Sequence, residues 1–248
     1  MTPEAGFSLY TVIDEGTRDV LVAAEEVAGF FVDPDDEPDE VTFSGLRFVD
    51  SRRRKTDDAV LEIANRHGER IGEYFVGRAE LCAAGSEVAG DRTSRATYRI
   101  FGARCEFPAA EPIWRRWATE ADLKKDEWLR LPTNDQDAWL HVVQNSWFAT
   151  GHRAARYGTD GVALLNGSHI STRTGFYCAI GEAVNGPGGY FGSNLDALAD
   201  CLSSGSGAEP ALRIAWQNFR SSEVSVGRDF LTSVMGVFRE FGVAVDTH

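Results

Sequence analysis

Asp196 and Asp200 are four residues apart, and of all the residues in this sequence this pair has the spacing best suited to binding a cationic partner. They lie in the segment 193–204, where leucines at helical spacing predict a helix that packs on a core. Side chains three or four residues apart share one face of a helix, so both carboxylates and Ala199 are predicted to point outward together. Such a pair of like charges gains nothing for the isolated helix. It suits a cationic site on a partner, unless both residues are ordinary surface acids.

The residues before this predicted helix add to the binding interpretation. Tyr190 and a glycine-rich stretch that includes Gly192 come first, and Ser193 or Asn194 is suited to cap the helix. A carboxylate held rigidly beside such a loop can replace a phosphate in a site built from Arg, Lys and His, through charge-assisted hydrogen bonds. Spacing alone favours the interpretation of Asp196 and Asp200 as ordinary surface acids over this one.

Strands and helices alternate regularly around this segment, from residue 161 onward. Short apolar runs predict strands, and apolar residues three or four apart predict helices. The expected strands are 161–166, 211–216 and 242–246, and the expected helices are 171–184, 193–204 and 226–241. Strands that alternate with helices pair in parallel through right-handed crossovers. The fold class is therefore α/β, with a three-stranded parallel sheet in this domain.

Three ordered motifs in this domain resemble the barstar family of ribonuclease inhibitors. The first is the string YFGxNLDALxDxL, which runs from Tyr190 to Leu202. Ile214-Ala215-Trp216-x-x-Phe219 and Val237-Phe238-Arg239-Glu240 follow it in the same order as in the family. VALLNG at 162–167 matches the family's opening strand and turn. The resemblance covers about the last third of the chain and implies a small inhibitor domain.

The resemblance also implies which residues bind a ribonuclease. Asp200 takes the place of the acid that enters the nuclease active site, and Asp196 flanks it against a second cation. Glu240, on the third predicted helix, is the corresponding acid at the far edge of the same face. The loop residues supply packing and polar contacts. The implied partner-binding residues are Tyr190, Gly192, Asn194, Asp196, Ala199, Asp200 and Glu240.

The sequence departs from the family pattern at three places. Ala199 stands where the family usually has an aromatic residue between the two acids. The stretch 203–207, SSGSG, replaces a loop that usually carries aromatic residues, and the third helix passes directly into its strand. These changes reduce the apolar contact area, and they leave open whether the target is barnase itself, a divergent ribonuclease or another toxin domain.

The first part of the chain predicts a strand-rich α+β domain of no family that its motifs identify. The expected strands are 7–14, 19–24, 40–50 and 95–107, with a β-hairpin over 59–77, a solvated acidic loop over 33–40 and a helix over 135–151. Small and polar residues over 153–161 suggest a boundary between domains 1–155 and 156–248. The length of 248 residues is consistent with two domains.

Two features of this first part have alternative interpretations. The basic run 51–55, SRRRK, could contact an anion or RNA, but a solvated turn is the more frequent role of such a run. Five of the six tryptophans lie between Trp114 and Trp147, where they could form a binding platform. Their helical spacing favours packing in a core instead.

Composition argues against several classes of protein. The net charge of −13 disfavours a nucleic-acid binder, which needs clustered basic residues, and suits a basic partner. No apolar run reaches the ~20 residues of a membrane span, and the N-terminus lacks the pattern of a signal peptide. The four cysteines and five histidines lack metal-ligand spacing, so reduced thiols and no metal are expected.

These observations predict a bacterial, cytoplasmic immunity protein or antitoxin that blocks a basic ribonuclease toxin. We expect no enzymatic activity, cofactor, nucleic-acid partner or membrane partner, because no catalytic motif such as a P-loop or nucleophile elbow is present. The alternative is an interaction module that recruits a partner other than a nuclease, with the main activity in the first domain.

Overall fold

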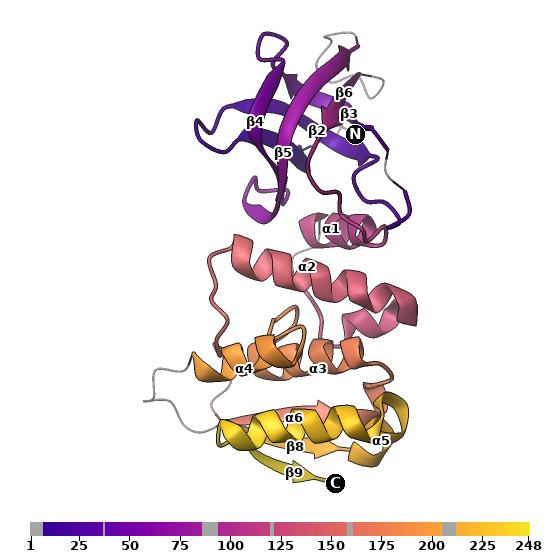
Figure 1. Ribbon diagram of the computed structural model, residues 1–248, viewed down its shortest axis with the longest axis vertical. Helices are drawn as coiled ribbons and strands as arrows, with labels where there is room; N and C mark the ends of the chain where they lie inside the picture. Colours follow the sequence, from indigo (N-terminus) through magenta and orange to yellow (C-terminus); the bar gives the residue numbers. More distant parts are fainter. Residues whose placement is uncertain (1–6, 37, 86–93, 120–121, 158–160, 205–211) are drawn as a thin grey trace, which may run out of the picture. The chain divides into compact units, whose positions relative to one another are not determined.

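The chain divides into two compact units, Met1–Ala121 and Asp122–His248 (Figure 1). The computed structural model describes all residues except 1–6, 37, 86–93, 120–121, 158–160 and 205–211. Each unit has its own core.

The first unit is a closed antiparallel barrel of six strands in the order β1-β2-β3-β6-β5-β4. The strands are β1 (Tyr10–Asp14), β2 (Val20–Ala28), β3 (Glu40–Val49), β4 (Lys55–Ala64), β5 (Arg70–Ala84) and β6 (Arg95–Ile100). Alternate side chains, such as Val41 and Phe43 on β3, are fully buried inside it. Pairing of β1 with β4 closes the barrel, so the predicted strands form a ring without a free edge.

The predicted strand 95–107 is shorter in the structure, where β6 ends at Ile100. The chain then crosses to the connection that follows β2. There the N–H of Cys105 donates to the carbonyl of Phe30 over 3.0 Å, and the N–H of Val32 donates to the carbonyl of Cys105 over 2.9 Å. The described part of the acidic loop 33–40 lies outside the strands up to Glu40, where β3 begins, and Glu37 is outside the described residues.

Helix α1 (Ala110–Thr119) packs on the barrel through Trp114. The buried indole donates from Nε1 to the Tyr74 hydroxyl over 2.9 Å, and it lies directly over Gly72. A Cβ at Gly72 would be 2.4 Å from the indole ring, so this contact requires glycine. Trp114 therefore packs in a core, as its helical spacing predicts.

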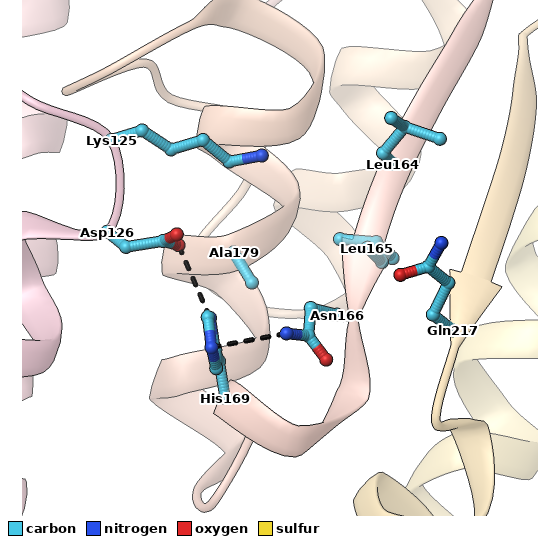
Figure 2. Close-up of a pocket in the computed structure, with 8 residues that line it drawn as sticks. All are labelled: Lys125, Asp126, Leu164, Leu165, Asn166, His169, Ala179 and Gln217. Atoms are coloured by element: carbon cyan, nitrogen blue, oxygen red, sulfur yellow. Dashed lines mark hydrogen bonds and ion pairs between the residues drawn. The ribbon is translucent and has the colours of Figure 1, made fainter.

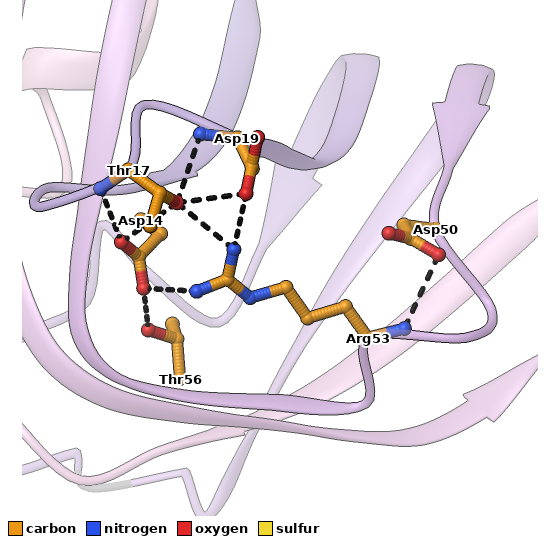
Figure 3. Close-up of polar contacts among 6 residues, drawn as sticks. All are labelled: Asp14, Thr17, Asp19, Asp50, Arg53 and Thr56. Carbon is orange, nitrogen blue, oxygen red and sulfur yellow. Dashed lines mark hydrogen bonds and ion pairs between the residues drawn. The ribbon is translucent and has the colours of Figure 1, made fainter.

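The basic run 51–55 contributes one arginine to an internal polar network (Figure 3). Arg53 pairs with Asp14 and with Asp19, each at 2.6 Å from nitrogen to oxygen. Thr56 also donates its hydroxyl to Asp14. The guanidinium of Arg53 is thus engaged within the fold, which argues against its use as a contact for RNA.

The second unit is built on a three-stranded parallel sheet in the order β7-β8-β9, which confirms the predicted α/β class. Its strands are β7 (Val162–Asn166), β8 (Arg213–Gln217) and β9 (Ala244–Thr247). Its helices are α2 (Gln136–Ala149), α3 (Arg173–Asn185), α4 (Leu195–Ser203), α5 (Phe219–Val226) and α6 (Arg228–Glu240). Short 3-10 helices cover Glu127–Arg130, Thr133–Asp135 and Gly167–His169.

The core between the sheet and its helices is aromatic. Trp216 on β8 is fully buried and stacks on Phe176 of α3, with ring centroids 5.6 Å apart. Phe230 of α6 meets the same Phe176 ring at 5.6 Å. Because Phe230 of α6 packs on the same Phe176 ring that stacks on Trp216, α3 and α6 cover the same face of the sheet.

Helix α2 lies on the side of α3 that faces away from the sheet (Figure 1). Thr172, which caps α3, donates its hydroxyl to Gln136 at the start of α2 over 2.9 Å. The division between compact units therefore lies upstream of the boundary expected at residue 155. The tryptophans Trp128, Trp139 and Trp147 are all buried, as the packing interpretation predicts.

Candidate functional site

Helix α4 presents its two aspartates on the outer side, as its spacing predicts. Leu198 and Cys201 are buried against the core, whereas Asp196 and Asp200 are exposed. Asn194 caps the helix, because its side-chain oxygen accepts from the N–H of Ala197 over 2.8 Å. That bond fixes the first turn and holds both carboxylates on a rigid element.

The acidic side chains of this face have no partner within the part of the chain that the structure describes. Asp196, Asp200 and Glu240 are all exposed, and no hydrogen bond or ion pair of their carboxylates is found there. Glu240 is the last residue of α6, which packs beside α4. The structure thus brings the two helices of the predicted face together and leaves the carboxylates free to bind cations.

The loop before α4 is buried, whereas the two aspartates of α4 are exposed. Tyr190 is only 2% exposed, and Gly192 is also buried. Gly192 has a φ of 99°, and a Cβ there would be 2.7 Å from the backbone nitrogen of Leu198. The loop can approach α4 this closely only with glycine at that position. In the free chain these two residues pack the loop, and their direct contact with a partner stays a prediction.

Tyr190 is covered by a residue from outside the predicted domain. The ring of Phe148, near the end of α2, lies 5.4 Å from the Tyr190 ring between centroids, in an edge-on arrangement. The Tyr190 hydroxyl is 3.4 Å from the Ser193 hydroxyl. Burial raises the pKa of Tyr190, and the charge of Asp200 raises it further, so the phenol stays neutral beside the acidic face.

A second candidate site is a cavity of about 230 Å³ at the carboxyl ends of β7 and β8 (Figure 2). Ligands commonly bind at this end of a parallel sheet. The polar groups there bond to each other: His169 lies 3.5 Å from Asp126 and 3.1 Å from Asn166. None of its lining residues is a Ser, Thr or Cys nucleophile.

Other classes of site find no support in the described residues. No group of three or more His, Cys, Asp or Glu side chains there could hold a metal ion. The described helices are all too short or too polar to cross a membrane. All four cysteines are free thiols, and Cys105, Cys178 and Cys201 are buried.

Comparison with protein families places this geometry in context. Residues 161–246 match the profile of the family described as Barstar (barnase inhibitor). The C-terminal part of this chain is a barstar domain. No curated protein matches the chain. The barstar match includes β7, β8, α4, Glu240 and β9 as far as Asp246, but it excludes α2 and Phe148.

Some residues of the site could be predicted from the sequence, and others could not. Its acids and the cap Asn194 lie where the motif predicts, while Ala199 is partly exposed between the two aspartates. The SSGSG stretch 203–207 is described only as far as residue 204, and 205–207 lie outside the described residues. Sequence reasoning missed Phe148 as a neighbour of Tyr190. Its place in the tryptophan-rich helix indicated packing, but not which loop it would cover.

Proposed function

We propose that this chain inhibits a ribonuclease by inserting the acidic face of α4 into the nuclease active site. The observation that supports this proposal is the pair Asp196 and Asp200, exposed and unpaired on a capped helix of a barstar domain. Ribonucleases bind phosphate with cationic side chains. Carboxylates at the same positions form charge-assisted hydrogen bonds with those cations and exclude the RNA substrate.

The charge of the chain supports a basic partner. A net charge of −13 attracts a cationic protein over distances set by the ionic strength, and this raises the association rate. The contact itself depends on the desolvated carboxylates, since Asp200 and its cation are removed from water together. Salt should therefore slow association more than it speeds dissociation.

We further propose that the partner is a toxin made by the same bacterial cell and that inhibition takes place in its cytoplasm. Ala199 leaves less apolar surface between the acids than an aromatic residue would. This favours a ribonuclease that differs from barnase in the surface around its active site. The barstar domain is an inhibitor domain and not a catalytic one, and we propose that the whole chain acts by binding alone.

Inhibition assays with the full chain test this function. The probes are barnase and any ribonuclease that is retained on the immobilised chain, each titrated against its activity on RNA. We expect stoichiometric inhibition, with Asp200→Ala raising the Kd by roughly 30-fold or more, a magnitude typical of charge pairs at interfaces, the barnase–barstar complex among them. Asp196→Ala should have a smaller effect in the same direction.

A matched control is Asp229→Ala. Asp229 is an exposed acid in the first turn of α6, about 16 Å along the helix from Glu240. This control should change the Kd by less than about threefold, as expected for a charge at or beyond the rim. Equal effects of Asp200→Ala and Asp229→Ala would exclude α4 as the inhibitory element. Recovery of only proteins without nuclease activity would favour the alternative of a recruitment module.

A further inference from the structure

Two exposed aromatic residues lie next to the loop of the acidic face, in a segment that the family match does not cover. Phe148, near the end of α2, is 44% exposed, and Tyr157 is 55% exposed. The barstar match begins at residue 161, so both precede it in the chain. Aromatic residues are enriched at protein interfaces, so two exposed rings beside a proposed binding loop are candidates for contact with a partner.

Phe148 contacts Tyr190 directly, and Tyr157 is linked to Tyr190 through Asn185. The Phe148 ring meets the Tyr190 ring at 5.4 Å between centroids. The backbone N–H of Tyr157 donates to the side-chain oxygen of Asn185 over 2.6 Å, and the Asn185 amide donates to the carbonyl of Tyr190 over 2.7 Å. The loop therefore holds Phe148 and Tyr157 in fixed positions relative to the start of α4.

A buried tryptophan anchors the same segment. Trp147 is 9% exposed, and its indole nitrogen donates to the carbonyl of Arg153 over 2.8 Å. Its ring also meets the Tyr157 ring at 5.5 Å between centroids. Because Trp147 and Phe148 are adjacent on α2, the first fixes the second. Phe148 lies on a helix, and Tyr157 is held by its contact with Trp147 and by the N–H of Arg153, which donates to its hydroxyl over 3.0 Å. Both rings would therefore lose little conformational entropy on binding.

We propose that Phe148 and Tyr157 form an apolar extension of the ribonuclease-binding face, here named the aromatic extension. This proposal rests on the proposed function, because the protein that would contact the two rings is the same ribonuclease that α4 blocks. Charged residues steer and orient a complex, and aromatic residues that become buried on binding are frequent additional hot spots of affinity. With Ala199 between the acids, α4 offers little of that surface. The aromatic extension supplies it from α2 and the segment after it.

Binding measurements on the full chain test this proposal. The probe is barnase, or the ribonuclease retained on the immobilised chain where barnase is not bound. We expect Phe148→Ala and Tyr157→Ala each to raise the Kd about tenfold. Two controls remove similar exposed apolar surface elsewhere: Phe75→Ala on β5, where Phe75 is 59% exposed, and Val224→Ala on α5, where Val224 is 81% exposed. Both should change the Kd by less than about twofold.

Photo-crosslinking separates direct contact from support of the loop. A benzoylphenylalanine that replaces Phe148 should crosslink to the ribonuclease, and one that replaces Val224 should not. The thermal midpoint of each free variant shows whether the fold is intact. An effect of Asp200→Ala without any effect or crosslink at Phe148 would overturn the aromatic extension and leave the proposed function in place. Failure to bind any ribonuclease would overturn both.

Discussion

The carboxylate of Glu182, on α3 of the barstar domain, accepts a hydrogen bond from the backbone N–H of Asp126 over 2.8 Å. Asp126 lies before α2 and outside the family match. Thr174 of α3 likewise donates its hydroxyl to Asp137 of α2. The barstar domain is therefore joined to the preceding segment by these hydrogen bonds, and both belong to one compact unit of the chain.

This joint predicts that a fragment 122–248 folds and that the shorter fragment 156–248 does not remain stable. The shorter fragment lacks α2, whose residues Trp139, Val142 and Val143 are buried. Burial of each such side chain contributes about 1.5–3 kcal/mol. Their loss is comparable with a typical domain stability of about 5–15 kcal/mol. Circular dichroism with urea denaturation of both fragments measures the difference, and equal stabilities would show that α2 is dispensable.

The same carboxylate predicts an unusual dependence of stability on pH. Burial raises the pKa of Glu182 from its ordinary value of 4.5 to about 7. The folded state then holds a proton that the unfolded state has lost, so the free energy of unfolding falls as pH rises from about 4.5 to 7. Burial lowers the pKa of His141 from 6.5 to about 4. This group therefore makes the free energy of unfolding rise as pH rises from about 4 to 6.5.

Glu182→Gln removes one of these two opposed contributions. Glutamine keeps an oxygen that can accept from Asp126 but does not titrate. We expect the variant to become more stable than wild type as pH rises from 4.5 to 7. Only the increase in the free energy of unfolding that His141 causes should remain in the variant. Urea denaturation of the fragment 122–248 at several pH values provides the measurement. Parallel curves for wild type and variant would mean that the Glu182 carboxyl titrates normally.

The α/β elements of the second unit were predictable because their signals are local. Apolar periodicity alone predicted β7, α3, α4, β8, α6 and β9 and their parallel pairing. Helix α5 was missed because its sequence, FRSSEVSV, is rich in serine and has no regular apolar repeat. It begins only where Asn218 takes a left-handed conformation with φ 52°.

The parts that the sequence did not predict depend on contacts between distant residues. The strands of the first unit were recognised singly, but closure of the barrel depends on pairing of β1 with β4. The helix over 135–151 was predicted, whereas its place on α3 depends on bonds such as Thr172 to Gln136. In the site, spacing predicted the outward aspartates of α4. Burial of Tyr190 could not be predicted, because Phe148 covers it from a distant part of the chain.

We expect the loss of the Arg53 side chain to destabilise the barrel, and the loss of the neighbouring Arg52 side chain to have no such effect. Removal of its side chain in Arg53→Ala leaves Asp14, whose side chain is 11% exposed, without its ion pair. We expect a loss of about 1–3 kcal/mol, against a negligible change for Arg52→Ala, because Arg52 is exposed. Hydrogen exchange of β1 and β4 in the full chain reports the difference. Equal exchange in both variants would show that the network does not stabilise the barrel.

Asp14 also predicts acid sensitivity of the barrel. The Thr56 hydroxyl and the Thr17 N–H hold its pKa near 2, below the ordinary value of 3.8, and Arg53 contributes in the same direction. The folded state therefore resists protonation of this carboxylate. The stability that it contributes is complete above pH 3.8 and is lost as pH falls through 2. Hydrogen exchange of β1, corrected at each pH for the intrinsic rate, should show a falling free energy of opening over that interval in wild type and no such fall in Asp14→Asn.

Gly192 predicts that the geometry of the loop, and not only its charges, sets affinity. Alanine at 192 would hold a non-glycine residue at φ 99° and place its Cβ 2.7 Å from the backbone nitrogen of Leu198. Relief requires the loop to move away from α4, so we expect a loss of stability of about 1–3 kcal/mol and weaker ribonuclease binding.

Gly236→Ala is the matched control, because Gly236 lies within α6 and a Cβ there meets no atom within 4 Å. Alanine favours a helix over glycine, so this control should stabilise the chain by about 0.5–1 kcal/mol and leave binding unchanged. Titration calorimetry and urea denaturation of both variants separate the two outcomes, and normal binding by Gly192→Ala would show that the loop adapts without moving the aspartates of α4.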